Sequence, residues 1–237
     1  MPRLALIQDL LFEPLSPPSN LLVEYDAASQ WYNTSLTMVA EWIKSGGTVS
    51  YNALAQSPSS IRSKLRRLGL DVEQLEKLDW EGLRILDGHA AAHGKKSTER
   101  LTFDSLKVAD LSISTSQEMK SEDYGPAPSH LIVMDDLSSL SRFNDEKALV
   151  EYELTRDFPY TVQYQLTNLI GVIGGIHSDY LYKRLEAEVD GVIDFKIEES
   201  AGEVVNFIRI RAMRNVGFDS RWHRLKIGEN FEVKLEK

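Results

Sequence analysis

The sequence predicts an α/β fold with a mainly parallel, twisted sheet flanked by helices. Two patterns carry this prediction: apolar runs of strand length alternate with helical segments, and the region after Val189 changes to strand-like segments separated by short turns. A third observation is that 237 residues, 42% of them hydrophobic, are enough to bury one large core. We therefore expect one domain over residues 1–237, with a lead-in at 1–19 and an antiparallel β extension at 189–237.

Five apolar runs are expected to form the parallel strands. They are Leu21–Val23, Thr48–Tyr51, Leu83–Asp87, His130–Met134 and Asn168–Gly175. Between them, the apolar residues of Thr34–Lys44 recur on one broad face of a helix that ends at Gly46. Ser57 followed by Pro58 is typical of a helix start, because Ser caps the first turn and Pro fits its first position. A polar stretch, Ser112–Pro128, is expected to be a linker.

The C-terminal region predicts an antiparallel addition to this sheet. Its strand-like segments are Gly191–Ile197, Glu203–Met213 and Leu225–Leu235. In the middle segment, side chains alternate between two faces, which puts Arg209 and Arg211 on the face opposite Ile208 and Ile210. These arginines form a charged outer face, bind a subunit or an anionic ligand, or contact nucleic acid. The sequence leaves the three alternatives open.

The composition excludes several classes of function. The 27 Lys and Arg against 36 Asp and Glu give a net charge of −9, which opposes sequence-independent binding to nucleic acid. The absence of cysteine removes disulfides, thiolate metal sites and cysteine nucleophiles. We find no export signal and no stretch near the roughly 20 apolar residues of a membrane span. We therefore expect a cytoplasmic protein without a membrane partner.

The order of these segments resembles the KaiC-like branch of the RecA superfamily, a group of P-loop ATPases that commonly assemble as rings or filaments. The resemblance spans nearly the whole chain. It includes the run His130–Ser138, which is similar to a Walker B strand and its following turn, and Ile208–Arg214, which is similar to the family's C-terminal hairpin. It implies a RecA-like fold and a homo-oligomer or an assembly with related ATPases.

The resemblance also implies a phosphate-binding loop after the first strand, and the residues there depart from the motif. Such a loop needs glycines that expose backbone N–H groups, a lysine, and a Ser or Thr hydroxyl. Tyr25–Asn33 contains no glycine and no lysine. The bulky Trp31 and Tyr32 are expected either to plug the site or to anchor a partner. Only Thr34 and Ser35 remain as hydroxyl ligands, with helix capping as their structural alternative.

Three further positions of the family pattern are changed or isolated. The carboxylates that relatives carry after the second strand are matched by Ala55 and Gln56, of which only Gln56 is able to position a water. The family's Lys-x-Arg on the C-terminal hairpin is reduced to Arg214. Asp135 ends a buried-type strand where a metal-coordinating carboxylate belongs, and its alternative role is that of an ordinary polar turn residue.

Two other clusters suggest no independent chemistry. His89 and His93 have the spacing of a metal-binding pair but lack a neighbouring Glu and a third ligand. Glu151, Glu153 and Asp157 are close in sequence, and we expect them on the solvated face of an amphipathic helix.

The sequence therefore predicts a KaiC/RecA-like pseudo-ATPase, without catalytic residues or a cofactor, that acts as a regulatory or scaffolding protein. Two alternatives stay open. One is a weak ATP- and Mg-binding protein of a KaiC-like ring that uses a nonstandard loop, and the other is a recombination accessory factor, similar to the RadA paralogues, that binds single-stranded DNA. The vestigial nucleotide-binding positions are Thr34, Ser35, Gln56, Asp135 and Arg214, with Asp135 the metal candidate; the candidates for an interface or an anionic ligand are Trp31, Tyr32, Arg209 and Arg211.

Overall fold

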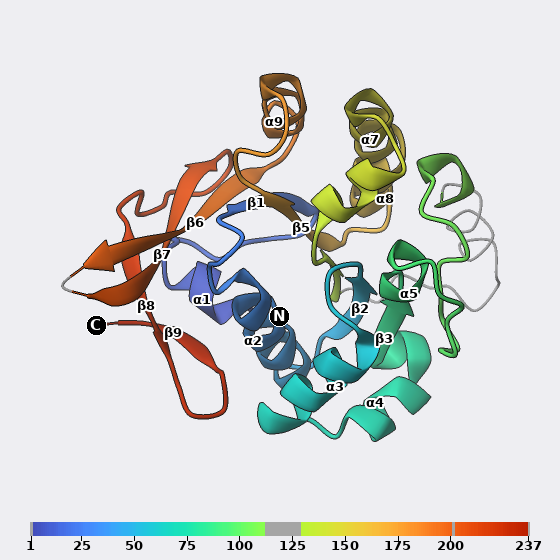
Figure 1. Ribbon diagram of the computed structural model, residues 1–237. Helices are drawn as coiled ribbons and strands as arrows, with labels where there is room; N and C mark the ends of the chain where they lie inside the picture. Colours follow the sequence, from blue (N-terminus) through green and yellow to red (C-terminus); the bar gives the residue numbers. More distant parts are fainter. Residues whose placement is uncertain (1, 112–128, 201, 237) are drawn as a thin grey trace.

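Within the residues that the computed structural model describes, 2–111, 129–200 and 202–236, nine strands form one sheet (Figure 1). The strand order is β3-β2-β4-β5-β1-β6-β7-β8-β9. The linker expected at 112–128 lies outside the described residues. The strands are β1 Ser19–Tyr25, β2 Thr48–Ala53, β3 Leu83–Asp87, β4 His130–Met134, β5 Thr167–Ile173, β6 Gly191–Ser200, β7 Glu203–Met213, β8 His223–Ile227 and β9 Val233–Leu235.

The sheet is parallel over six strands and antiparallel over the rest. β1 pairs in parallel with β5 and β6, β2 with β3 and β4, and β4 with β5. β6 through β9 pair antiparallel in sequence order. The predicted fold class is therefore confirmed. The segment Leu225–Leu235, expected as one strand, is instead two strands, because the chain reverses where the Gly228 N–H donates to the Glu232 carbonyl oxygen.

Helices cover both faces of the sheet (Figure 1). α2 and α3 pack on one face, in a core that includes Leu21 and Val23 of β1, whereas α7 and α9 pack on the other face with Leu22. Successive side chains of a strand point to opposite faces, which explains this alternation. The helices are α1 Ala5–Gln8, α2 Trp31–Lys44, α3 Pro58–Arg67, α4 Val72–Lys77, η1 Asp79–Glu81, α5 His89–Ala92, η2 Leu137–Arg142, α7 Glu146–Tyr152, η3 Glu153–Asp157, α8 Phe158–Gln163 and α9 Asp179–Glu186.

The first long helix begins earlier than expected. α2 starts at Trp31 rather than Thr34, and the preceding Gln30 makes no side-chain capping bond. The Trp31 side chain is fully buried, so packing rather than a polar cap fixes the first turn. The start of α3 follows the sequence signal, because the Ser57 hydroxyl accepts the Ser60 N–H and Pro58 occupies the first helical position.

The segment expected to be a plain amphipathic helix contains a wider turn. α7 continues through the π-helical turn η3 into α8. Glu153, the first residue of this turn, is 0% exposed, whereas Glu151 remains exposed. The expected solvated face is therefore wrong for Glu153, because residues two apart on a helix of 3.6 residues per turn lie on nearly opposite sides.

Candidate functional site

A short loop of five residues, 26–30, joins β1 to α2 at the carboxyl edge of the parallel strands. Ligands of open α/β sheets bind at this edge. The loop is tied to the neighbouring strand, because the Asp26 carboxylate accepts the Ile197 N–H at 3.0 Å and the Asp26 N–H donates to the Phe195 carbonyl oxygen at 3.1 Å. Asp26 is therefore engaged in holding the loop against β6.

The Trp31 side chain fills the space behind this loop. Its indole N–H donates to the Asp135 carbonyl oxygen at 2.7 Å, and its ring packs 5.7 Å from the Phe195 ring and 6.0 Å from the Tyr25 ring, centroid to centroid. Gly171 of β5 makes room for it: a Cβ at that position would lie 2.5 Å from the indole nitrogen. The indole is thus a fully hydrogen-bonded part of the core.

Two tyrosine side chains extend the packed region around Trp31 toward the turn after β4. The hydroxyl groups of Tyr25 and Tyr32 are 2.8 Å apart, and Tyr25 also hydrogen-bonds to the Asp136 carboxylate. Burial raises the pKa of both tyrosines, so both hydroxyls stay protonated. Of the two residues proposed as an exposed aromatic anchor, Trp31 is fully buried and Tyr32 is partly buried.

The hydroxyls of Thr34 and Ser35 point into the protein. Both residues are fully buried within α2. The Thr34 hydroxyl donates to the Gln30 carbonyl oxygen at 2.7 Å, and the Ser35 hydroxyl donates to the Tyr32 carbonyl oxygen at 3.0 Å and lies 3.1 Å from the Tyr51 hydroxyl. These contacts satisfy the hydroxyls within the protein by donation to carbonyl oxygens of the preceding turn, and neither residue caps the helix.

Asp135 links the end of β4 to the turn after β2. Its carboxylate accepts backbone N–H groups from Leu54 at 2.8 Å, Ala55 at 3.1 Å and Gln56 at 3.2 Å, and the residue has no exposed surface. Burial raises the pKa of Asp135 to about 7, and the three N–H groups partly oppose that rise. Three donors converging on one buried carboxylate give Asp135 a structural role at this edge.

The other vestigial positions divide between the two edges of the sheet. Gln56 lies beside Asp135, where its side chain accepts from the Lys64 ammonium at 3.0 Å. The Arg214 side chain donates to the Ala187 carbonyl oxygen, and its backbone N–H bonds to Asp190, next to the amino end of β1. The structure therefore groups Ser35, Gln56 and Asp135 and leaves Arg214 at the opposite edge of the same subunit. Among the described residues, no group of three or more His, Asp or Glu could hold a metal ion.

The arginines of β7 form salt bridges with neighbouring carboxylates. Arg209 contacts the Asp194 carboxylate at 2.7 Å, and Arg211 contacts the carboxylates of Glu24 at 2.6 Å and Glu186 at 2.8 Å. The Arg209 guanidinium also lies 4.4 Å from the centroid of the Trp222 ring. Each positive charge is thus balanced locally, which weakens the field available to an anionic ligand.

Sequence analysis did not single out an aligned Ser–His–Glu group. The Nε2 atom of His177 lies 2.9 Å from the Ser138 hydroxyl, and its Nδ1 atom lies 3.2 Å from the Glu146 carboxylate. The Ser138 hydroxyl also accepts the Ile173 N–H at 2.9 Å, and Ser138 is buried. This arrangement joins the turns after β4 and β5, and no proximity in sequence could have indicated it.

The strand order and the helices on both faces define a RecA-like α/β domain. The sequence profile of the KaiC ATPase family matches residues 35–235, and the chain belongs to this family. The matched range begins inside α2 and leaves out β1 and the loop after it.

Among solved structures, the chain is similar to a KaiC-like protein of the hyperthermophilic archaeon Pyrococcus horikoshii. The TM-score is 0.70 at 17% sequence identity, and the alignment covers 97% of this chain and 94% of that chain. The likeness shows a shared fold. No curated protein matches the chain. In the described residues, no helix is long and apolar enough to cross a membrane.

Proposed function

We propose that this chain is a KaiC-family protein that does not hydrolyse ATP and acts as a regulatory or scaffolding subunit. The observation that carries the proposal is the buried Trp31 indole, hydrogen-bonded to the Asp135 carbonyl oxygen behind the loop after β1. A phosphate-binding loop works by turning free backbone N–H groups toward an anion, which requires small residues and open space. Here an aromatic side chain occupies the position from which a lysine would reach the phosphates.

Counting along the chain supports this assignment. The motif Gly-x-x-x-x-Gly-Lys-[Ser/Thr] leads from a strand into a helix. With its first glycine at Tyr25, the last residue of β1, the second glycine falls on Gln30, the lysine on Trp31 and the hydroxyl residue on Tyr32. The side chains at all four positions are bulkier than those of the motif. On this count, the hydroxyl residue of the motif corresponds to Tyr32 and not to Thr34.

The environment of Asp135 supports the same proposal. A Mg²⁺ ion takes oxygen ligands at about 2.0–2.1 Å and keeps several waters. The Asp135 carboxylate has no exposed surface and already accepts three backbone N–H groups. A metal ion at this carboxylate would have to displace those donors from the turn after β2.

The scaffolding part of the proposal rests on family membership. KaiC-like proteins commonly assemble as rings or filaments, and a subunit without turnover still contributes its surfaces to such an assembly. We infer that the partner is a second copy of this chain or an active relative. Light scattering of the chain alone and of its mixture with an active KaiC-like ATPase tests this part. Monomers in both samples would contradict it.

Nucleotide titration tests the loss of hydrolysis. We expect no saturable binding of a fluorescent ATP analogue with Mg²⁺ and no phosphate release from ATP. Turnover that disappears in Asp135→Ala would overturn the proposal, and micromolar Mg-dependent binding would instead favour a nonstandard ATP site that uses Gln56 and Arg214. Salt-sensitive binding of single-stranded DNA, weakened by Arg209→Ala and Arg211→Ala, would favour the recombination factor.

A further inference from the structure

The sheet has one apolar face and one polar face over β2 to β5. On the face covered by α2 and α3, these strands present mainly apolar or aromatic side chains, with Asp87 and Thr167 at strand ends as polar members. The apolar and aromatic residues are Val49, Tyr51, Ala53, Leu83, Ile85, Leu131, Val133 and Leu169. The opposite face presents Ser50, Asn52, Arg84, His130 and Asn168 among fewer apolar residues. Buried polar groups lower stability unless they are paired, so a polar face beneath covering helices calls for an explanation.

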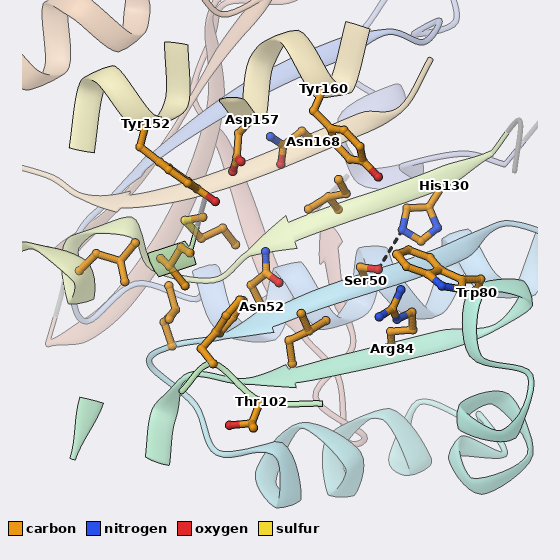
Figure 2. Close-up of a pocket in the computed structure, with 17 residues that line it drawn as sticks. Ser50, Asn52, Trp80, Arg84, Thr102, His130, Tyr152, Asp157, Tyr160 and Asn168 are labelled. Carbon is orange, nitrogen blue, oxygen red and sulfur yellow. Dashed lines mark hydrogen bonds between the residues drawn. The ribbon is translucent and has the colours of Figure 1, made fainter. Parts of the chain in front are cut away.

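A pocket lies over this polar face. Its cavity volume is about 100 Å³, and the cavity opens to solvent. The strands β2, β3, β4 and β5 form its floor, and residues of η3 and α8 form one wall (Figure 2). A buried water needs at least about 10–15 Å³ on this measure, so the cavity has room for a small ring, and a larger ligand would extend into solvent. The pocket lies on the face of the sheet and is distinct from the filled loop after β1, so it does not depend on the proposed function.

The His130 ring, at one end of the pocket, is satisfied within the protein. The two ring nitrogens of His130 lie 2.8 Å from the Thr48 hydroxyl and 3.0 Å from the Ser50 hydroxyl. Burial, helped by the charge of Arg84, lowers the pKa of His130 to about 3, so the ring is neutral. Arg84 contacts the Asp79 carboxylate at 3.2 Å, and its guanidinium lies 3.2 Å from the centroid of the Trp80 ring.

The opposite end holds one buried acceptor that lacks a donor. Asn168 is 2% exposed, and its side-chain oxygen has no hydrogen-bond partner among the described residues. Figure 2 shows Asn168 and Asp157 directed into the pocket between Tyr152 and Tyr160. Behind Asp157, both carboxyl oxygens of the fully buried Glu153 also lack a partner within the described part of the chain. This end therefore offers oxygen acceptors to a ligand that supplies N–H donors.

The remaining lining indicates the shape of that ligand. Aromatic rings of Trp80, Phe103 and Tyr160 face the pocket, and they favour a flat ring by stacking. The carboxamides of Asn52 and Asn168 each combine a donor and an acceptor, which is the pattern that pairs with the edge of an amino-bearing base. The Asp157 carboxyl group, whose pKa burial raises to about 6, is mostly ionised at neutral pH and opposes an anion.

We propose that this pocket binds a small aromatic heterocycle with an exocyclic amino group, of nucleobase or nucleoside size and without phosphate. The amino group donates to the Asn168 side-chain oxygen and the Asp157 carboxyl group. The ring lies among the aromatic side chains. Asn52 hydrogen-bonds to the ring edge.

Isothermal titration of the full chain with nucleosides tests the proposal. Adenosine, cytidine and guanosine carry the amino group, and inosine and uridine lack it. We expect at least one amino-bearing nucleoside to bind at least tenfold more tightly than the two that lack the group. AMP should bind more weakly than adenosine at neutral pH, because the Asp157 carboxylate repels its phosphate. Failure of every nucleoside to bind, or equal affinity for adenosine and inosine with no binding of cytidine or guanosine, would overturn the proposal.

Substitutions of pocket residues test whether the ligand binds in this pocket. Asn168→Leu and Asp157→Asn are expected to weaken binding at least tenfold, whereas Glu151→Gln, an exposed carboxyl change on α7, should leave it unchanged. If Asn168→Leu does not fold, Asn52→Leu, at a partly exposed position, replaces it. Binding that survives all pocket variants would place the ligand elsewhere and refute the proposal. Because ATP and Mg²⁺ are absent from this assay, its failure leaves the proposed loss of hydrolysis unaffected.

Discussion

Replacing Glu153 by Gln is expected to stabilise the protein at neutral pH and to flatten the pH dependence of its stability. Glu153 is fully buried at the start of the π turn, and neither carboxyl oxygen has a hydrogen-bond partner among the described residues. Burial, and then the charge of Asp157, raises the pKa of Glu153 well above its usual value. The folded state therefore keeps a proton that the unfolded chain releases.

The sign and the magnitude follow from proton linkage. Above the ordinary Glu pKa of 4.5, the folded state binds more protons than the unfolded state, so stability falls as the pH rises toward the raised pKa. One proton corresponds to about 1.4 kcal/mol per pH unit, or up to about 2.7 kcal/mol between pH 5 and pH 7. Gln keeps the shape of the side chain and does not titrate, so this slope is lost. A smaller slope remains, because burial also raises the pKa of Asp157.

Urea unfolding followed by circular dichroism at pH 5, 6, 7 and 8 measures this difference. The wild type should lose stability more steeply than Glu153→Gln, with the largest gap at the higher pH values. Glu151→Gln is the matched control, because Glu151 is exposed on the same helix and should follow the wild type. Equal pH slopes in the wild type and Glu153→Gln would refute the burial argument.

Three further substitutions test the filled site. Asp135→Ala is expected to lower the free energy of unfolding by at least about 3 kcal/mol, because three backbone N–H groups lose their acceptor at about 1–3 kcal/mol each; an unchanged urea midpoint would contradict this. Gly171→Ala should cost about 1–3 kcal/mol through overpacking, and less in a Trp31→Leu background, where the clash of its Cβ with the indole is gone and that with the Asp135 carbonyl oxygen remains. Trp31→Lys should lose about 3–5 kcal/mol of stability without creating ATP binding. Melting with and without Mg-ATP measures it, and a rise in melting temperature with Mg-ATP would show that one residue blocks the site.

The fold could be predicted because its signals are local. Buried-type runs such as His130–Met134 are strands, and the cap at Ser57 with Pro58 starts α3 as expected. The alternation of side chains in the C-terminal segments predicted the antiparallel extension, but it did not predict the division into β8 and β9. A turn of a few polar residues between two short strands differs little in sequence from a continuous edge strand.

The candidate site was predictable only in part. The missing glycines and lysine are visible along the chain, and so is the position of Asp135 at the end of β4. The polar face of the sheet was not predicted, although Ser50 and Asn168 lie in runs that were expected to be strands. Its meaning depends on which strands become neighbours and on which helix covers them. The burial of Glu153 opposite the exposed Glu151 agrees with helical spacing, whereas the π turn that begins at Glu153 has no periodic signal in the residue pattern.

Trp31, Gly171 and Asp135 form one packing unit although they come from three separate elements. The indole fits only because Gly171 has no side chain, and its N–H is satisfied only because the Asp135 carbonyl oxygen lies beside it. A loop that lacks the glycines and the lysine of the motif can have open space behind it, or a side chain can fill that space. Open space behind the loop would be a cavity that small anions could enter. When a side chain fills that space, its contacts become part of the core. Under the proposed function, we expect phosphate binding to require a different loop, a different residue at position 31 and a repacked core together, and a lysine introduced at position 31 alone to lower stability without creating a ligand site.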